Sequence, residues 1–179
     1  MINEPKKEYN KNNQLTKLTN YNKGGTVHST IEYNQNGTET KETYYHEDGT
    51  VHSIIEYEYD QNDQLTKETI YNQGGTIDYI TEYNQNGVIH YIDEYNQNEK
   101  LIKSTNYYKC GAIHFIVEYN QNGAKTKRTF YYKNGTIGFI EENNPKTNKP
   151  TKYTKYNQDG IIEESNDKKT PTIKTTNTL

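Results

Sequence analysis

The stretch from Gly75 to Asn98 reads GTIDYITEYNQNGVIHYIDEYNQN, and it decides the fold. It contains one twelve-residue pattern twice: a glycine, a run rich in β-branched residues, an acidic residue and the sequence Tyr-Asn-Gln-Asn. Such periodic sequence indicates a repeat protein, in which each unit packs on its neighbours instead of around one central core.

Tyrosine and glycine mark this repeat along the chain. Tyrosines recur every twelve residues from Tyr9 to Tyr45 and, after a two-residue slip at Tyr57-Glu58-Tyr59, from Tyr59 to Tyr131, and the series returns once more at Tyr156. Nine of the 12 glycines lie four residues after a tyrosine of this series: Gly25, Gly37, Gly49, Gly75, Gly87, Gly111, Gly123, Gly135 and Gly160. Elsewhere the same position holds Asn13, Asp63, Glu99 or Asn148. Because glycine, asparagine and aspartate best tolerate a left-handed backbone, the pattern predicts type I turns followed by a residue with positive φ.

The segments between these turns are rich in Thr, Ile, Val and Tyr and have the length of ordinary strands. A helix is excluded because turn signals recur every twelve residues and no apolar helical stripe survives between them. Polar strands of the Leu-Thr-Lys kind alternate with more apolar strands of the Thr-Ile kind, which gives a 24-residue hairpin repeat. We therefore expect an all-β fold, a repetitive antiparallel meander of twelve or so strands in an elongated, twisted sheet. A sheet curled into a solenoid or half-barrel is the alternative.

Three segments are expected along the chain: an N-terminal lead-in (1–8), a β-repeat domain (9–165) and a flexible C-terminal tail (166–179). Residues 83–94 are an extra copy of the apolar strand, so the alternation is interrupted in mid-chain. Simple strand alternation predicts that one face carries Ile77, Tyr79, Thr81 and Tyr83.

Composition limits the function classes. Only 29% of residues are hydrophobic and the mean hydropathy is −1.26, so an ordinary two-layer core is not expected. The net charge of −3 gives no broad cationic field for nucleic acid. No segment is long and apolar enough to span a membrane, and the start lacks a secretory signal. The sequence as written predicts a cytoplasmic protein, or a secreted one if a signal peptide has been removed.

Residue patterns that carry chemistry are not found, and we expect no enzyme activity, no catalytic residues, no metal site and no cofactor. Four histidines share one repeat position, and we interpret them as solvated: His28, His52, His90 and His114. A row of glutamates ends the apolar strands and lysines occupy the complementary position, which indicates charge pairing between strands. Cys110 stands where other turns have asparagine and has no partner for a disulfide.

The tyrosines form the candidate binding surface. Aromatic bands bind peptides, sugars and proteins because tyrosine offers contact area at low entropic cost. The alternative is that these rings only pack across their own sheet. The candidate residues are Tyr71, Tyr79, Tyr83, Tyr91, Tyr95, Tyr107, Tyr119 and Tyr131.

The alternating motifs resemble a repeat family of unknown function found in phytoplasmas and related wall-less bacteria. The best copies are Leu65–Glu82 and Leu101–Glu118, and the likeness covers about residues 9–165. More distantly, the chain is similar to MORN-like and YD-type β-repeat proteins, although it lacks the second glycine positions of true MORN units. The resemblance implies a β-repeat fold and no particular mechanism.

Together these features predict a non-enzymatic repeat protein whose sheet binds an unknown protein partner, with a bacterium–host setting as one option. A structural protein that self-associates through its terminal strands is the alternative.

Overall fold

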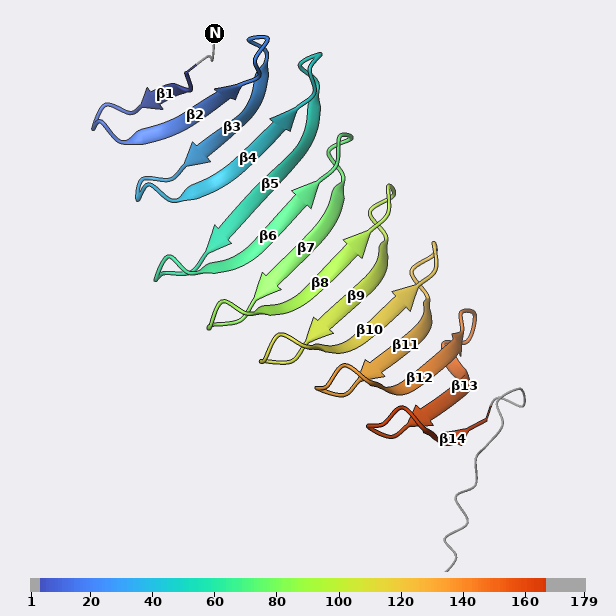
Figure 1. Cartoon of the computed structure of the whole chain (residues 1–179). Coiled ribbons are helices and arrows are strands. Elements are labelled where there is room, and N and C mark those ends of the chain that lie inside the picture. The colour runs from blue at the N-terminus through green and yellow to red at the C-terminus, as the bar shows by residue number, and fades with distance from the viewer. Residues whose placement is uncertain (1–3, 167–179) are drawn as a thin grey trace, which may run out of the picture. The chain divides into compact units, whose positions relative to one another are not determined.

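The computed structural model describes residues 4–166, and every regular element in that range is a β-strand. The chain divides into two compact units, an N-terminal unit of residues 1–87 with 97–99 and a C-terminal unit of residues 88–96 with 100–179. The predicted tail therefore lies, from residue 167 onward, outside the described residues. In both units the strands follow one another in the order in which they occur in the chain (Figure 1).

The N-terminal unit is an antiparallel meander in which each strand pairs with the next. Pairing begins at Lys6, inside the segment assigned to the lead-in. The strands are β1 (Lys6–Tyr9), β2 (Leu15–Tyr21), β3 (Val27–Tyr33), β4 (Glu39–Tyr45), β5 (Val51–Tyr59), β6 (Leu65–Tyr71) and β7 (Ile77–Tyr83).

The C-terminal unit repeats the same arrangement. Its strands are β8 (Ile89–Tyr95), β9 (Leu101–Tyr107), β10 (Ile113–Tyr119), β11 (Lys125–Tyr131), β12 (Ile137–Asn144), β13 (Lys149–Tyr156) and β14 (Ile162–Ser165). The total is fourteen strands where the sequence predicted twelve or so, because short strands form at both ends of the described chain. The all-β antiparallel meander is confirmed. The solenoid or half-barrel alternative is wrong, since each sheet is open.

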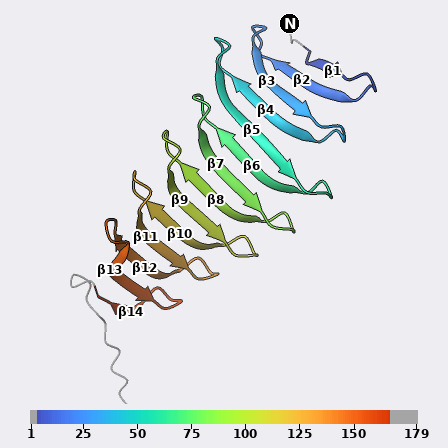
Figure 2. The ribbon, with the colours of Figure 1, turned by 180° about the vertical axis from the view of Figure 1, so that it is seen from behind.

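Neither face of these sheets is covered by a second layer of the described chain, as views from opposite sides show (Figures 1 and 2). Consequently few side chains are fully buried. Val117, at 6% exposure, is the one buried hydrophobic residue in the described range. The other buried residues are polar, mostly threonines at the centre of a strand: Thr19, Ser29, Thr30, Thr43, Thr69, Thr81, Thr105, Thr129 and Asn143.

The structure confirms the positive φ angles that the sequence predicts in the turns. All nine predicted glycines have positive φ, and so do Asn13, Asp63, Glu99 and Asn148, with φ between 53° and 59°. The asparagine or aspartate that follows the strand tyrosine folds the turn through its side chain. For example, Oδ1 of Asn34 accepts hydrogen bonds from the backbone N–H of Asn36 (2.9 Å) and of Thr38 (3.0 Å). This contact explains why asparagine or aspartate follows the tyrosine in most turns, although His46, Tyr108 and Tyr132 take its place in three of them.

Each hairpin also contains a β-bulge, which changes the predicted faces. Tyr71 lies opposite Ile77 while Ile70 lies opposite Tyr79, so Asp78 is the extra residue. Because directly opposed residues share a face, the bulge places Ile77 on the face of Tyr71. The prediction that Ile77 shares a face with Tyr79 is therefore wrong, because simple alternation takes no account of the bulge.

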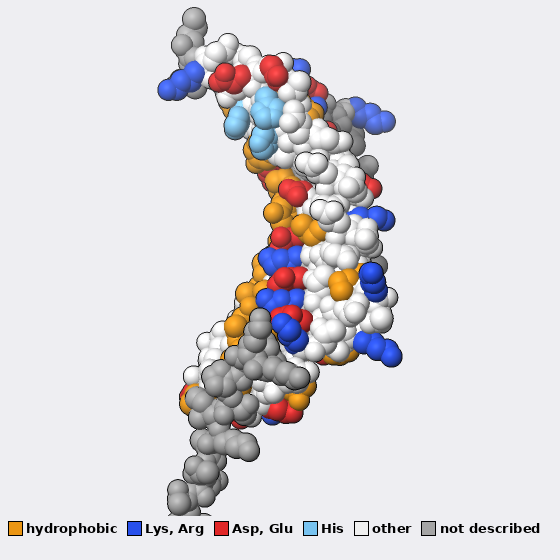
Figure 3. All heavy atoms as spheres, turned by 90° about the vertical axis from the view of Figure 1, so that its right-hand side faces the viewer, with side chains coloured by type: hydrophobic (Ala, Val, Ile, Leu, Met, Phe, Trp, Pro, Cys, Tyr) orange, Lys and Arg blue, Asp and Glu red, His pale blue; other side chains and the backbone are white. Residues whose placement is uncertain are grey.

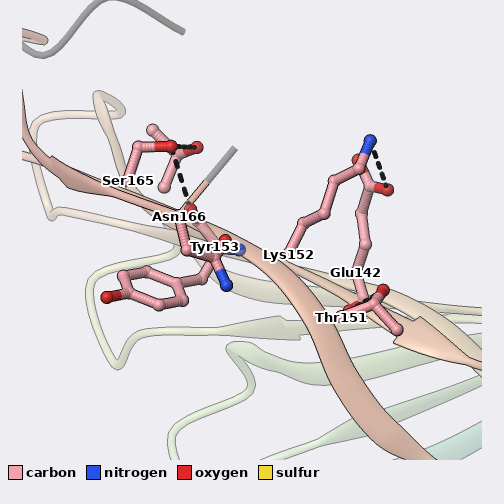
Figure 4. A network of polar contacts seen from close by, with 7 residues as sticks. Glu142, Thr151, Lys152, Tyr153, Ser165 and Asn166 are labelled. Carbon is pink, nitrogen blue, oxygen red and sulfur yellow. Dashed lines mark hydrogen bonds and ion pairs between the residues drawn. The ribbon is translucent and has the colours of Figure 1, made fainter. Parts of the chain in front are cut away.

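The end of the described sheet is held by a compact polar network (Figure 4). Oδ1 of Asn166 accepts a hydrogen bond from the backbone N–H of Tyr153 at 2.6 Å, and the Ser165 hydroxyl donates to the carbonyl of Tyr153 at 3.2 Å. On the other side of β13 the Thr151 hydroxyl donates to the carbonyl of Glu142 at 3.1 Å. The first two contacts join the end of the described chain to β13, and the third joins β13 to β12.

Candidate interaction surfaces

The register gives each unit two different faces. We call the face that carries the lysines of the Leu-Thr-Lys strands the ladder face and the opposite one the reverse face. In the N-terminal unit the opposed residues on the ladder face alternate in charge across five strands: Glu8, Lys17, Glu32, Lys41 and Glu56. Opposite charges in directly opposed positions stabilise the pairing, so this row fixes the register.

The two-residue slip preserves this alternation. β5 has nine residues where most strands have seven, and it carries two glutamates on the ladder face. Glu56 forms an ion pair with Lys41 at 2.9 Å, and Glu58 forms one with Lys67 at 2.8 Å. The Lys41 ammonium lowers the pKa of Glu56, and the carboxylate raises the pKa of Lys41 in return. The slip thus supplies one carboxylate to each neighbouring strand.

The C-terminal unit has an equivalent ladder. Its ion pairs are Lys103–Glu94 at 2.6 Å, Lys127–Glu118 at 3.6 Å and Lys152–Glu142 at 3.7 Å. Figure 3 shows a row in which basic and acidic side chains alternate beside a band of hydrophobic ones. The sequence prediction of charge pairing between the glutamate and lysine rows is confirmed. Since these charges are matched within the chain, the ladder faces are electrostatically satisfied.

The reverse face of the N-terminal unit is different. Glu42 lies opposite Ile31 and Ile55, and Glu68 lies opposite Tyr57 and Thr81, so neither carboxylate faces a cation across the sheet. From Tyr33 to Tyr83 the sequence contains two lysines, Lys41 and Lys67, against eleven acidic residues. Both lysines are on the ladder face. The carboxylates of the reverse face are surrounded by tyrosines instead.

These residues form one cluster, the Tyr57 surface, which consists of Tyr33, Glu39, Glu42, Tyr44, Tyr57, Tyr59, Glu68 and Tyr83, all half-buried. The Tyr44 hydroxyl donates to Glu42, and the Tyr83 hydroxyl donates to Glu68 at 3.1 Å. The His28 ring lies beside this cluster, with its centroid 6.1 Å from that of Tyr44. On this reverse face tyrosine hydroxyls therefore hydrogen-bond to the glutamates, whereas on the ladder face lysines form ion pairs with them.

The tyrosines of this cluster have raised pKa values, because their rings are partly buried and lie near carboxylates. Burial and the Glu68 carboxylate raise the pKa of Tyr83 to about 12. The pKa of Tyr57 is raised further, first by burial and then by Glu42 and Glu68. Burial followed by Glu39 raises the pKa of Tyr33 and of Tyr59 in the same way. Each shift has the sign expected when a phenolate would form beside carboxylates.

The reverse face of the C-terminal unit carries cations among its aromatic rings. The Arg128 guanidinium lies over the Phe115 ring, 4.8 Å from its centroid, and Phe115 lies opposite Phe130. The His114 ring packs against the Phe130 ring at 4.9 Å, where burial and then the Arg128 charge lower the pKa of this histidine. Burial and then Asp93 raise the pKa of Tyr119.

The structure separates the eight predicted surface tyrosines. The register places Tyr71, Tyr107 and Tyr131 on ladder faces, opposite Ile77, Ile113 and Ile137. The other five lie on reverse faces, two in the N-terminal unit and three in the C-terminal unit: Tyr79, Tyr83, Tyr91, Tyr95 and Tyr119. The eight residues therefore do not form a single band.

The shared histidine position is the bulge position of the apolar strands. Like Asp78, these bulge residues have no directly opposed residue on the preceding strand. They are His28, His52 and His114, and Gly138 has the same position in β12. In two hairpins the first turn residue packs over this position, with ring centroids 4.8 Å apart for His46 and His52 and 4.2 Å apart for Tyr108 and His114. Gly138 has no side chain because a Cβ there would lie 2.9 Å from the Tyr132 ring. His90 contacts the ring of Tyr91.

Among the residues of the Tyr57 surface, only Tyr83 had been predicted from the sequence as a binding residue. Two signals were available. One is the slip that adds Tyr57, and the other is the excess of acidic residues between Tyr33 and Tyr83. Within residues 4–166 no group of three or more His, Cys, Asp or Glu side chains is arranged to hold a metal ion. The same range contains no helix able to cross a membrane.

Comparison with known proteins gives a family and distant structural likenesses. A family model described as "Protein of unknown function (DUF2963)" matches residues 21–58, 83–130 and 130–177. Among curated proteins, none matches the sequence. The predicted membership in a repeat family of unknown function is thus confirmed, while the narrower resemblance to phytoplasma, MORN-like and YD-type repeats stays a prediction.

Three solved structures illustrate the structural likeness. A TarM mutant of S. aureus in complex with Fondaparinux, alpha-GlcNAc-glycerol and UDP is 10% identical, with a TM-score of 0.34, over 69% of this chain and 21% of that one. The TcdB2-TccC3-Cdc42 structure is 14% identical, with a TM-score of 0.32, over 88% of this chain and 10% of that one. A protein of unknown function from Bacteroides fragilis is 14% identical, with a TM-score of 0.21, over 87% and 94% of the two chains. This chain thus spans about a fifth and a tenth of the first two chains.

Proposed function

The chain belongs to the DUF2963 family of proteins of unknown function, and we propose that it is a non-enzymatic binding protein whose sheet receives a protein partner on its reverse face. The observation that supports this proposal is the difference between the faces. The ladder faces neutralise their own charges, whereas the reverse face of the N-terminal unit carries half-buried tyrosines beside carboxylates without an opposed cation.

Tyrosine is suited to such a role because its ring offers a large contact area and has few rotatable bonds. Here several rings are also held in place by their hydroxyls. Tyr44 and Tyr83 are bound to glutamates on the same face, so little conformational entropy remains to be lost on binding. The proposal also includes a location in the cytoplasm or, if a signal peptide has been removed, secretion. A secreted protein would act in a host.

A second candidate is self-assembly, which the open sheets favour because β1 and β14 each have one edge without a strand of the described chain. The β1 edge is poorly suited to this role. All four of its residues are exposed, two of them are lysines, and Pro5 precedes them. Short strands with lysine and nearby proline are typical of edges that resist pairing with other chains.

Capture of partners by the full chain, compared with two variants, tests the binding proposal. Tyr33→Ser with Tyr59→Ser alters the reverse face, and Tyr45→Ser with Tyr71→Ser alters the ladder face as the matched control. We expect a protein that is retained by the wild type and by the ladder-face control and lost from the reverse-face variant. Equal retention by all three would contradict a role of the reverse face. Light scattering during size-exclusion chromatography tests assembly, which predicts a mass that grows with concentration.

A further inference from the structure

We propose that the Tyr57 surface is a receptor for an arginine-rich, cationic segment of a partner polypeptide. This inference deepens the proposed function, on which it rests, by naming the chemistry of the partner. It starts from a charge that the chain leaves unmatched on one face of one unit.

The first step is the location of the charge. Between Tyr33 and Tyr83 two lysines stand against eleven acidic residues, and both lysines are engaged with glutamates of the ladder face. Glu39, Glu42 and Glu68 lie on the other face, where the opposed residues are tyrosine, isoleucine or threonine. A cationic partner would therefore not compete with an internal ion pair.

The second step is the kind of cation. The carboxylates are bordered by the rings of Tyr33, Tyr44, Tyr57, Tyr59 and Tyr83, which lie on neighbouring strands. An arginine side chain uses both features, since its planar guanidinium stacks on aromatic faces and donates two parallel hydrogen bonds to a carboxylate. The C-terminal unit shows this chemistry within the chain, where the Arg128 guanidinium lies over the Phe115 ring.

The third step is a comparison of equivalent strands. β4 reads Glu39-Thr-Lys-Glu42-Thr-Tyr44-Tyr and β11 reads Lys125-Thr-Lys-Arg128-Thr-Phe130-Tyr. The two strands thus carry opposite charges at the same reverse-face positions. In β11 the internal arginine occupies the aromatic surface, and in β4 that position is a glutamate. β4 accordingly lacks the cation that β11 has at this position, and an external guanidinium complements it.

The slip adds the last element. Relative to the regular repeat, β5 gains Tyr57 and Glu58. Glu58 completes the ladder with Lys67, whereas Tyr57 lies on the reverse face opposite Glu68. Tyr57 is two residues from Ile55 in β5, and Ile55 lies opposite Glu42, so Tyr57 has Glu68 on one side and Glu42 near it on the other. In keeping with this placement, burial and then Glu42 and Glu68 raise the pKa of Tyr57. The ring therefore stands in the middle of the carboxylates.

The test uses the full chain and a fluorescent peptide of about ten residues in which arginine alternates with serine. A peptide with glutamate in place of arginine and one with lysine are the controls. We expect anisotropy to show binding of the arginine peptide that weakens as salt is added, weaker binding of the lysine peptide, and none of the glutamate peptide.

Matched charge reversals decide whether this surface is responsible. Glu42→Arg introduces the residue of the equivalent position in β11, and Glu47→Lys introduces the residue of the equivalent turn position, Lys133. Both change the net charge by the same amount in the same unit. We expect Glu42→Arg to weaken binding by on the order of tenfold and Glu47→Lys by at most about twofold. Tyr57→Ala should also weaken binding, while Tyr57→Phe, which retains the ring, should not.

Three results would overturn the inference: no binding of the arginine peptide at low salt, equal weakening by the two reversals, or equal binding of the arginine and glutamate peptides. Circular dichroism of each variant establishes that it is folded. If the arginine peptide does not bind but a partner is still lost from the reverse-face variant in the capture experiment, the proposed function stands and only the identity of the partner is wrong.

Discussion

The reverse faces of β4 and β11 show how one repeat produces two surfaces. Both strands place a charged residue and an aromatic residue in the same positions, Glu42 with Tyr44 in one and Arg128 with Phe130 in the other. The ladder-face lysines Lys41 and Lys127 are the same in both. The ladder is constrained because it pairs strands, whereas the reverse-face positions change charge without disturbing the register.

The difference extends to the units as a whole. Residues 1–87 contain seven basic and fourteen acidic residues, although the complete chain has a net charge of only −3. An overall charge near neutrality thus conceals an acidic N-terminal unit. The composition of the whole chain predicted that there is no broad cationic field for nucleic acid, and the acidic N-terminal unit is consistent with that prediction.

The largest effect is expected where the C-terminal unit depends on apolar packing. Val117→Lys should destabilise the fold by roughly 3 kcal/mol or more, because it places a second cation directly opposite Arg128 at a buried position. Urea denaturation measures the change, with Glu118→Gln at the neighbouring ladder position as control. An unchanged midpoint would show that the reverse face of this unit is not held together by packing.

The turns along the described chain share one backbone conformation, and a reciprocal pair of substitutions tests its cost. Gly37→Glu should destabilise the fold by about 1–2 kcal/mol, because Gly37 has a φ of 82°. Glu99→Gly should be neutral or stabilising, since Glu99 already bears the cost of a φ of 54°. Thermal denaturation should give a lower midpoint for Gly37→Glu than for the wild type, and an equal or higher midpoint for Glu99→Gly. Equal losses would mean that side-chain contacts, not backbone conformation, decide these positions.

Alkaline titration distinguishes the Tyr57 surface from ordinary surface tyrosine. The pKa of Tyr83 is about 12 in the folded state against 10.0 for an unperturbed tyrosine. A raised pKa means that the stabilisation is fully present below about pH 10 and is lost as the pH rises toward 12. Tyrosinate absorbance of the wild type minus that of Tyr83→Phe should show this late titration. Glu68→Gln should move it toward lower pH, and no movement would exclude Glu68 as a cause.

The smallest effect concerns the ladder. A double-mutant cycle on Lys67 and Glu58 should give a coupling of roughly 0.2–1 kcal/mol, because both side chains are partly solvated. The same cycle on Lys67 and Glu82, which are opposed in the register, should give less than the Glu58 cycle. A larger coupling to Glu82 would mean that the slip does not serve the ladder.

Much of this fold was readable from the sequence because its information is local. The thirteen turn positions, the strand character between them and the pairing of the lysine and glutamate rows follow from spacing alone. The turn residues adopt positive φ whatever surrounds them, so no tertiary contact is needed to predict them.

What only the tertiary structure decided is which side chains share a face. The bulge in each hairpin reverses the alternation at one residue, so Tyr71 and Tyr83 lie on opposite faces although both belong to the same tyrosine series. The sequence by itself determined where the strands and turns lie. The Tyr57 surface depends on register, because Glu42 and Glu68 become neighbours of Tyr57 only when β4, β5 and β6 are aligned side by side.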